Sequence, residues 1–403
     1  MQSAAPGPTG PVYAERHLGR PRGFGGGRGV RFVEVSLSPS IALWSDWSRR
    51  VVVRCGTVDY VSVCHTPDGR ASEPAMNWFE QTFGFTEQGP DHVRAHLRLD
   101  GDTITSTVNG ARVGCGRLTL PSLGELRASG GGDADDDDAA PSTLVEVVGD
   151  VAALHRDPAN AGALFQAASQ FNLLEMVSPR VTPDEGVGVY SYDRTQGPAC
   201  AIACGGGTVY RNYFAPVAGG VGQTADRQID ALADLEVALG AGHWRMQNGY
   251  ALATVEGLRA INGQLAAADD EALDRLRGML RVGVQHAVQV LGTSHVVTQV
   301  YGSALPVAYG DPPAPLWEPF ARLVLDASYE ATLRIAHAEG IERVFLTQLG
   351  GGVFGNASAW IEDAIVRAVS MVPGLDVRLV SYGASQASAQ RIVARCARPA
   401  RAR

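Results

Sequence analysis

The stretch FLTQLGGGVFGN, residues 345–356, joins an apolar run to a helix-like segment through three consecutive glycines. A fourth glycine and an asparagine end the stretch. A turn that only reverses the chain needs one or two glycines. A loop that brings bare backbone N–H groups against a phosphate needs more, because side chains would hold the anion away. The spacing therefore predicts a phosphate-binding loop, with a tight turn packed between a strand and a helix as the alternative.

The flanking residues predict where this loop lies. ERVFLTQ (342–348) is typical of a strand, and ASAWIEDAIVRAVSMV (357–372) is typical of a helix that ends before Pro373. A loop between them belongs at the carboxyl edge of a sheet, where ligands bind in open α/β folds. It also faces the positive end of the helix dipole. We expect Asn356 to cap that helix through its side-chain oxygen.

Residues 350–355 also match the dinucleotide-binding pattern GxGxxG, but the context excludes a Rossmann domain. That pattern opens such a domain, and an acid at the end of the next strand holds the ribose. Here the next strand, DVRLV (376–380), leads into Ser381 and Tyr382. The few residues that follow cannot supply the remaining strands and helices. We therefore assign the loop to the end of a sheet built from earlier strands.

The composition predicts a soluble globular protein of two domains: the chain has 403 residues, of which 45% are hydrophobic and 19% charged. No apolar run reaches the roughly 18–20 residues that span a bilayer, so no membrane partner is expected. The net charge of −8 argues against nucleic-acid binding. The absence of lysine excludes a Walker-type phosphate loop and a lysine Schiff base.

The six cysteines are scattered and form no CxxC pair, which predicts reduced, buried thiols. We therefore expect an intracellular protein, cytoplasmic or nuclear. Residues 1–29 are rich in glycine, proline and arginine and have no apolar signal core. They are predicted to be a disordered tail, with an organelle transit peptide as the alternative.

Residues 30–127 predict a smaller β-rich N-terminal domain, because strand-like segments alternate around Asp-Gly and Asn-Gly turn signals. Its aromatic cluster NWFEQTFGF (77–85) is typical of a core or a domain interface. Residues 128–142, ASGGGDADDDDAAPS, predict a solvated linker. Metal binding by these aspartates is the alternative, but nothing in the sequence imposes a coordination geometry on them.

From residue 143 the pattern changes to alternating strands and helices, which predicts an α/β domain with helices packed on a parallel or mixed sheet. STLVEVVGD (142–150) is typical of its first strand, and residues 315–340 predict a long amphipathic helix that ends at Gly340. The domain is predicted to extend to residue 385. Residues 386–403, rich in arginine and alanine, are predicted to be a C-terminal tail.

This order of elements resembles the macrodomain, a three-layer α/β/α module that binds ADP-ribose. The resemblance covers roughly residues 143–385. Six segments carry it, in the expected order: Gly149-Asp150-Val151 after the first strand, QAASQFN (166–172), DRTQGPACAIA (193–203), VVTQVYGSALPVAYG (296–310), LGGGVFGN (349–356) and VRLVSYG (377–383). Between the third and fourth motifs the chain is longer than a minimal macrodomain and is similar to the elaborated poly(ADP-ribose) glycohydrolase type. It lacks the Gly-Gly-Gly…Glu-Glu catalytic stretch of that type in the expected loop.

The resemblance implies roles for individual residues at the two ends of ADP-ribose. Asp150 would accept a hydrogen bond from the adenine amine, with capping of the next helix as the alternative. Tyr382 would lie over the adenine ring, with an ordinary surface position as the alternative. Asn172 or Gln170 would face the distal ribose.

The two glycine-containing loops would hold the diphosphate. Gln196 and Gly197 would contact it from the first loop. The main-chain N–H groups of the second loop would wrap around it, with Val353 and Phe354 beside the ribose. The other residues assigned to this second loop are Gly350, Gly351, Gly352, Gly355 and Asn356.

Hydrolysis of an ADP-ribosyl bond needs a carboxylate or the substrate's own phosphate near the distal ribose, to activate water and stabilise an oxocarbenium-like centre. Glu185 and Asp193 are the candidate catalytic acids, with solvated loop positions as the alternative. The resemblance thus implies a hydrolase that removes ADP-ribose from proteins or small metabolites. A non-catalytic reader of ADP-ribosylated protein, whose N-terminal domain binds a protein partner, is the alternative. Neither a cofactor nor a metal is expected.

Overall fold

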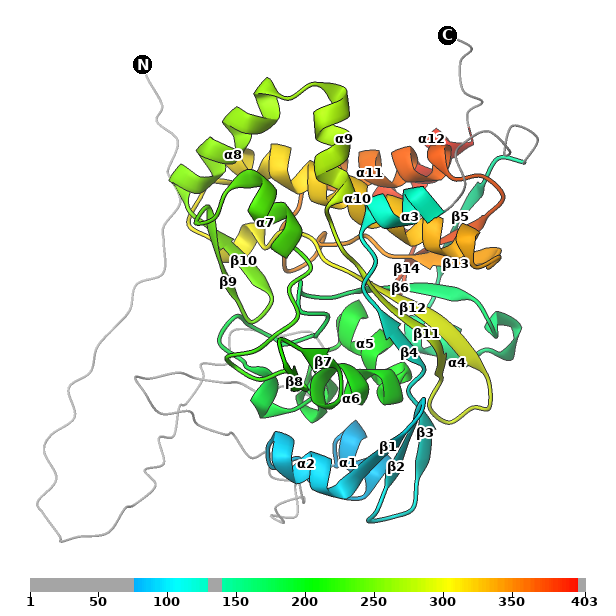
Figure 1. Ribbon diagram of the computed structural model, residues 1–403. Coiled ribbons are helices and arrows are strands. Elements are labelled where there is room, and N and C mark those ends of the chain that lie inside the picture. The colour runs from blue at the N-terminus through cyan, green and yellow to red at the C-terminus, as the bar shows by residue number, and fades with distance from the viewer. Residues whose placement is uncertain (1–75, 130–139, 398–403) are drawn as a thin grey trace, which may run out of the picture. The chain divides into compact units, whose positions relative to one another are not determined.

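A seven-stranded mixed sheet organises the described part of the chain (Figure 1). The computed structural model describes residues 76–129 and 140–397. In spatial order the strands are β4 (Arg117–Thr119), β11 (Gly283–Gln289), β12 (Val296–Gly302), β6 (Leu164–Ala168), β13 (Arg343–Leu346), β14 (Asp376–Ser381) and β5 (Thr143–Val148). The expected α/β class with a mixed sheet is confirmed.

The strand directions bring two distant loops to one edge of this sheet. The five strands from β12 to β5 are parallel to one another, whereas β11 runs antiparallel to both β4 and β12. β6 and β13 are direct neighbours, with Val344 opposite Leu164 and Phe345 opposite Phe165. Since parallel neighbours end at the same edge, the segment after β6 and the glycine loop after β13 lie close together.

The central strands are buried on both faces, as expected for parallel strands between two helical layers. In β6, Leu164 packs into one hydrophobic cluster and Phe165 into another. The Phe165 ring is stacked between the rings of His155 and Phe345, with centroid separations of 3.7 and 4.4 Å. The alternation of β6 therefore supplies one residue to each face of the sheet.

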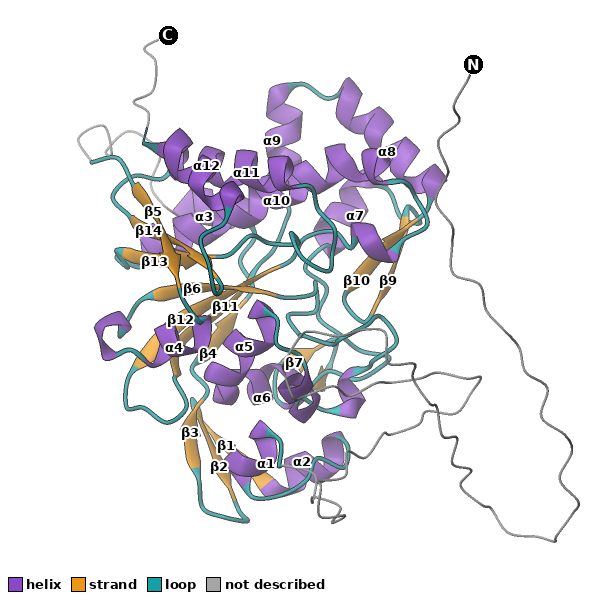
Figure 2. Cartoon of the chain, turned by 180° about the vertical axis from the view of Figure 1, so that it is seen from behind, coloured by secondary structure: helices purple, strands orange, loops and turns teal. Residues whose placement is uncertain are grey.

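Helices cover both faces of the sheet (Figures 1 and 2). The 25-residue α10 (Ala314–Ala338) packs on β12 and β13 and is the centre of the larger layer. The confirmed amphipathic pattern gives it a buried stripe that includes Phe320, Leu323, Val324 and Ala327. Four other helices pack on it: α3 (Leu123–Ser129), α8 (Val255–Ala267), α9 (Asp270–Gly278) and α11 (Ser358–Met371).

The opposite face carries α4 (Val151–Arg156), α5 (Gln196–Ala203) and α6 (Gly205–Tyr213). The glycines that begin α6 let it approach the sheet closely. A Cβ at Gly206 would lie 2.6 Å from the carbonyl oxygen of Gly114, and a Cβ at Gly207 would lie 2.9 Å from the Gln285 side chain. Only glycine allows the helix this close to the strands.

The enlarged middle of the chain adds short elements: α7 (Ala233–Leu239), the hairpin of β9 (Trp244–Gln247) and β10 (Tyr250–Ala253), and the hairpin of β7 (Pro216–Val217) and β8 (Gly220–Val221). Four 3-10 turns complete the described elements: Pro158–Asn160, Pro183–Glu185, Gly188–Tyr192 and Val307–Tyr309. Across residues 76–129 and 140–397, no helix has the length and apolar character needed to cross a membrane.

A separate β-rich domain over residues 30–127 is not confirmed, and residues 30–75 lie outside the described part. The rest forms α1 (Trp78–Phe83), α2 (Pro90–His96), a small sheet of β1 (Leu97–Asp100), β2 (Thr103–Ser106) and β3 (Arg112–Gly114), then β4 and α3. Because β4 pairs with β11 and α3 packs on α10, this segment belongs to the same compact body as the following described residues.

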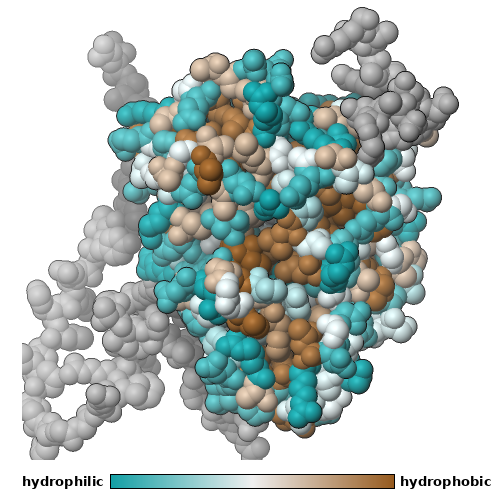
Figure 3. All heavy atoms as spheres, viewed as in Figure 1, coloured by the Kyte–Doolittle hydropathy of each residue, from teal (hydrophilic) through white to brown (hydrophobic). Residues whose placement is uncertain are grey.

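On the face shown in Figure 3, hydrophobic residues gather around the β4 edge of the sheet.

The aromatic cluster of residues 77–85 lies in the core, as predicted. Trp78, Phe79 and Phe83 are buried against a set that includes Met176 and Tyr190. The predicted linker lies between α3 and β5, and its residues 130–139 are outside the described part.

The prediction of a tail from residue 386 is wrong for most of that segment. Residues Ala387–Cys396 form helix α12, which packs on α11 and β5. Ala389 and Ile392, three residues apart on one side of the helix, are fully buried, and Arg391 pairs with Glu362 at 2.5 Å. The high arginine content hid a one-sided apolar pattern.

A buried carboxylate joins three helices of the larger layer. The side chain of Glu330 on α10 is fully buried and accepts hydrogen bonds from Arg127 at 2.7 Å, Arg334 at 2.8 Å and Arg367 at 2.8 Å. Burial alone would raise the pKa of Glu330, but these arginines outweigh burial and lower the pKa from 4.5 to about 2. The carboxylate therefore holds α3 and α11 onto α10.

We predict that Glu330→Gln lowers the free energy of unfolding at neutral pH by about 3 kcal/mol, because it leaves three half-buried guanidinium groups without their counter-charge. The folded-state pKa is depressed, so this contribution is present above pH 4.5 and is lost as the pH falls toward 2. Urea unfolding at several pH values measures it. Glu271→Gln, at an exposed pair with Arg275, is the control and should have little effect. A constant difference between wild type and Glu330→Gln from pH 7 to pH 3 would contradict the assignment.

Candidate functional site

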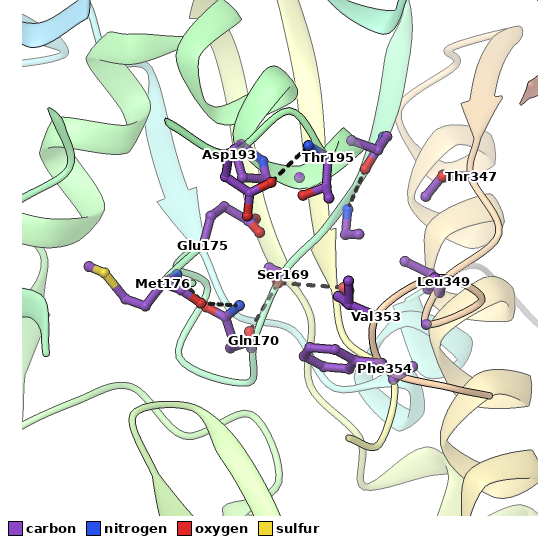
Figure 4. A pocket seen from close by; sticks show the side chains of 18 of the residues that line it. Ser169, Gln170, Glu175, Met176, Asp193, Thr195, Thr347, Leu349, Val353 and Phe354 are labelled. Atoms are coloured by element: carbon purple, nitrogen blue, oxygen red, sulfur yellow. Dashed lines mark hydrogen bonds between the residues drawn. The ribbon is translucent and has the colours of Figure 1, made fainter. Parts of the chain in front are cut away.

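A pocket of about 180 Å³ opens at the carboxyl ends of β6 and β13 (Figure 4). One wall comes from the segment after β6 and the start of α5, and another from residues 347–354. In Figure 4, Glu175 and Asp193 lie on one side, and Leu349, Val353 and Phe354 lie on the other. The glycine loop thus borders a cavity, where the sequence predicted it.

The glycine loop exposes backbone donors at this cavity. The N–H groups of Gly350, Gly352, Val353 and Phe354 donate to no acceptor within the described residues, and all four residues line the pocket. Gly350 has φ of 71°, in the left-handed region that favours glycine, and an added Cβ would overlap with Ala304. A side chain is therefore excluded at Gly350, while the backbone amides of the loop stay open to the cavity.

Asn356 holds this loop in shape and is not the predicted helix cap, because α11 begins only at Ser358, after Ala357. Its side-chain amide donates to the carbonyl of Leu305 at 2.8 Å, and its backbone N–H donates to Gly350 at 2.9 Å. The buried side chain therefore ties the glycine loop to the turn that follows β12.

The remaining glycines of the loop do not line the pocket. A Cβ on Gly351 would lie 3.1 Å from the Ile361 side chain of α11, so this residue faces the helix. Gly355 has φ of 74° and its N–H donates to Gly352, which closes the turn. Both residues shape the loop, while the donors at the cavity come from their neighbours.

The amino-terminal end of α5 forms the facing wall. The side chain of Gln196 accepts from the N–H of Ala168 at 2.9 Å and donates to the carbonyl of Gln166 at 2.8 Å, which ties the helix to the end of β6. The backbone N–H groups of Gln196 and Gly197 donate to no acceptor in the described part of the chain. This helix end therefore offers open donors and a positive dipole to the cavity.

Glu175 is a site residue that the sequence interpretation missed. It lines the pocket, is only 5% exposed, and its Oε1 has no hydrogen-bond partner. Burial raises its pKa well above 4.5; nearby Arg211 lowers the pKa, and Asp193 raises it further. The carboxyl group is therefore protonated over a wider pH range than an ordinary glutamate. A signal was present, since one acid interrupts the apolar run FNLLEMV (171–177).

The two predicted catalytic acids are placed differently. Asp193 is half-buried, lines the pocket and accepts from the N–H of Thr195 at 2.8 Å. Glu185 is exposed and accepts from the N–H of Thr182 at 3.2 Å in a capping box, away from the pocket. The structure brings Asp193, together with Glu175, to the cavity.

The residues expected around adenine do not line the cavity. Asp150 is exposed and caps α4, accepting from Ala152 at 2.7 Å and Ala153 at 3.1 Å, which is the alternative role considered for it. Tyr382 is 76% exposed after the end of β14. Asp150 follows β5 and Tyr382 follows β14, so both residues lie closer to the β5 edge of the sheet than the ends of β6 and β13, where the pocket opens.

Of the two candidates for the distal ribose, Gln170 lines the pocket and Asn172 does not. Asn172 is fully buried; it donates to Gln228 at 2.9 Å and accepts from the N–H of Leu174 at 3.1 Å. The side chain of Gln170 is bound to the backbone of Met176. Both amides therefore shape the turn that carries Glu175.

Three aromatic rings form an apolar wall of the cavity. Tyr250, Tyr309 and Phe354 have ring centroids 5.1 to 5.6 Å apart, and all three line the pocket. The hydroxyl of Tyr250 donates to the carbonyl of Met176 at 2.8 Å. Because Tyr250 belongs to β10, the enlarged middle of the chain supplies part of the site. Among the described residues, no group of three or more potential ligands could hold a metal ion.

No protein-family model matches the chain, and no curated protein matches it. Solved structures that match include a point mutant of the poly(ADP-ribose) glycohydrolase from Thermomonospora curvata, at 14% identity over 73% of this chain and 93% of that chain, with a TM-score of 0.34. The same enzyme bound to the inhibitor ADP-HPD matches at 15% identity over the same shares, with a TM-score of 0.35. A point mutant of the Deinococcus radiodurans glycohydrolase in complex with ADP-ribose matches at 13% identity over 70% of this chain and 92% of that chain, with a TM-score of 0.37.

We predict that Gly197→Ala distorts the pocket, because the added Cβ would overlap with the Glu175 carboxyl group and the Ala168 carbonyl. The cost should be about 1–3 kcal/mol in the free energy of unfolding, measured by chemical denaturation. Gly352→Ala is the matched control, since nothing lies within 4 Å of its added Cβ. Equal stability of the two variants would show that Gly197 does not pack as described.

Proposed function

We propose that this pocket binds ADP-ribose or a related nucleoside diphosphate. The observation that carries the proposal is the pair of facing donor sets: open amides of the glycine loop on one wall, and the free N–H groups of α5 on the other. Such donors bind phosphate oxygens well, because they are fixed in place and need no counter-charge. The diphosphate lies between them in this proposal, and the aromatic wall packs against a ribose.

The size of the pocket limits how the ligand lies. The volume of about 180 Å³ is smaller than the roughly 300–1,000 Å³ of sites that enclose a drug-sized ligand. The enclosed part therefore takes the diphosphate and one ribose, and the rest of the nucleotide extends across the open rim.

We further propose that the site hydrolyses an ADP-ribosyl linkage, with Glu175 as the general acid and Asp193 as the general base. Glu175 donates its proton to the leaving-group oxygen as the bond to the ribose anomeric carbon breaks. Asp193 accepts a proton from the water whose oxygen bonds to that carbon. Two carboxyl groups in different environments suit these opposite roles, because burial keeps Glu175 protonated.

We expect Gly352→Glu to weaken ADP-ribose binding at least 30-fold, because it places a negative charge beside the diphosphate. Gly352→Gln, of the same size but neutral, should bind within about threefold of wild type, because nothing lies within 4 Å of a Cβ at Gly352 and the side chain can turn into that space. Isothermal titration calorimetry measures both. No binding by wild type at millimolar ADP-ribose, or equal loss in both variants, would refute the proposed diphosphate position.

We expect Glu175→Gln to lower kcat for release of ADP-ribose from an ADP-ribosylated protein by about 100-fold or more, with ADP-ribose binding kept within a few-fold. In wild type, activity should fall as the pH rises through the raised pKa of Glu175, because the proton to be donated is lost. Exposed Glu185→Gln is the control and should be fully active. If the wild type binds ADP-ribose without turnover, the alternative of a non-catalytic reader is favoured. In that alternative, binding of a protein partner by the N-terminal residues stays a prediction.

A further inference from the structure

Arg211 is a buried cation behind the pocket. It lies on α6 with no exposed surface, and its guanidinium carbon lies 3.6 Å from the centroid of the Tyr301 ring. Its Nε donates to the carbonyl of Leu173 at 3.0 Å, and its Nη2 donates to the Thr208 hydroxyl at 3.1 Å. Its Nη1 is buried without any hydrogen-bond partner. The guanidinium therefore has neutral partners and one free donor.

Such an arrangement is costly for a residue that only fills space. Burying a cation without a counter-charge destabilises a fold by several kcal/mol, and a methionine would fill a similar volume without that cost. Glu330, in contrast, has all its arginine partners in place. The burial of Arg211 thus indicates a negative charge that forms at another stage.

Glu175 is the group that can supply this charge. Its Oε1 is buried and also lacks a partner, and the positive charge of Arg211 lowers the pKa of Glu175. Among the described residues, Arg211 is the cation and Asp193 the anion whose charges act on Glu175. The charge of Glu175 in turn acts on Tyr190, Cys200, Tyr250 and Tyr301. Asp193 opposes ionisation of Glu175, so Arg211 alone in this set favours it.

We propose that Arg211 is a positioning residue that receives the Glu175 carboxylate through its free Nη1 once Glu175 has released its proton. This inference rests on the proposed role of Glu175 as the acid. When the proton passes to the leaving-group oxygen, the electron pair of the O–H bond stays on Glu175. Arg211 then compensates the buried negative charge, and the pair separates when Glu175 takes up a proton from solvent.

The test compares Arg211→Met and Arg211→Lys with wild type in the pH dependence of kcat and KM. Arg211→Met should lower kcat about 10-fold or more, leave KM within about twofold, and move the decline of activity at high pH to a higher pH by about one unit. Arg211→Lys keeps the charge and should restore part of both effects. Exposed Arg180→Met, outside the pocket lining, is the control for removing an arginine and should match wild type. An unchanged high-pH limb in Arg211→Met would overturn the proposal.

A second measurement needs no substrate and separates this proposal from the proposed function. Urea unfolding measures the difference in free energy of unfolding between Glu175 and Glu175→Gln proteins as a function of pH. The measurement is made in the wild-type background and in the Arg211→Lys background. Because the folded-state pKa of Glu175 is raised, the glutamate form loses stability relative to the glutamine form as the pH rises toward that pKa. The Arg211→Lys background lacks the forked guanidinium donors. There, the stability of the glutamate form relative to the glutamine form should keep falling to a higher pH than in the wild-type background. Identical curves in both backgrounds would refute the pairing even if ADP-ribose is bound and hydrolysed. A shift in a protein that binds no ADP-ribose would refute only the proposed function.

Discussion

The parallel pairing of β6 with β13 is the constraint on which the rest of the site depends. It places the residues after position 168 and those after position 346 at one edge of the sheet, although almost 180 residues separate them along the chain. Gln196 then ties the start of α5 to the end of β6, and Asn356 ties the glycine loop to the turn after β12. Each wall of the pocket is thus held by hydrogen bonds to the sheet or its loops, which keeps open donors facing the same cavity.

Two buried glutamates show how the same side chain takes opposite roles. Glu330 meets three arginines and stays ionised, so it stabilises the packing of α3, α10 and α11. Glu175 accepts no hydrogen bond from an arginine, so burial dominates and its pKa is raised. The difference lies in the partners that the fold supplies, since burial alone would raise the pKa of both.

Much of the α/β part could be predicted from local patterns. The strands around residues 143–148 and 376–381, the long helix α10 and the glycine loop all have strong periodicity or turn residues, and they lie where expected. The predictions were wrong where a high content of arginine and alanine concealed an apolar helix face, as in α12. They also failed where a segment pairs with a strand distant in sequence, as β4 does with β11. A three-residue strand is too short to show in its own sequence that it pairs with a strand more than 150 residues away.

Local patterns in the sequence specify the class of fold, the absence of lysine chemistry, and a loop whose glycines keep backbone donors accessible. These properties are local, because periodicity, residue type and glycine freedom act within a few residues. Which side chains face the cavity depends on tertiary packing: Glu175 and Asp193 line it, whereas Asp150, Asn172, Glu185 and Tyr382 do not. That choice depends on burial and on partners brought from distant strands and helices, and these exist only once the sheet has formed.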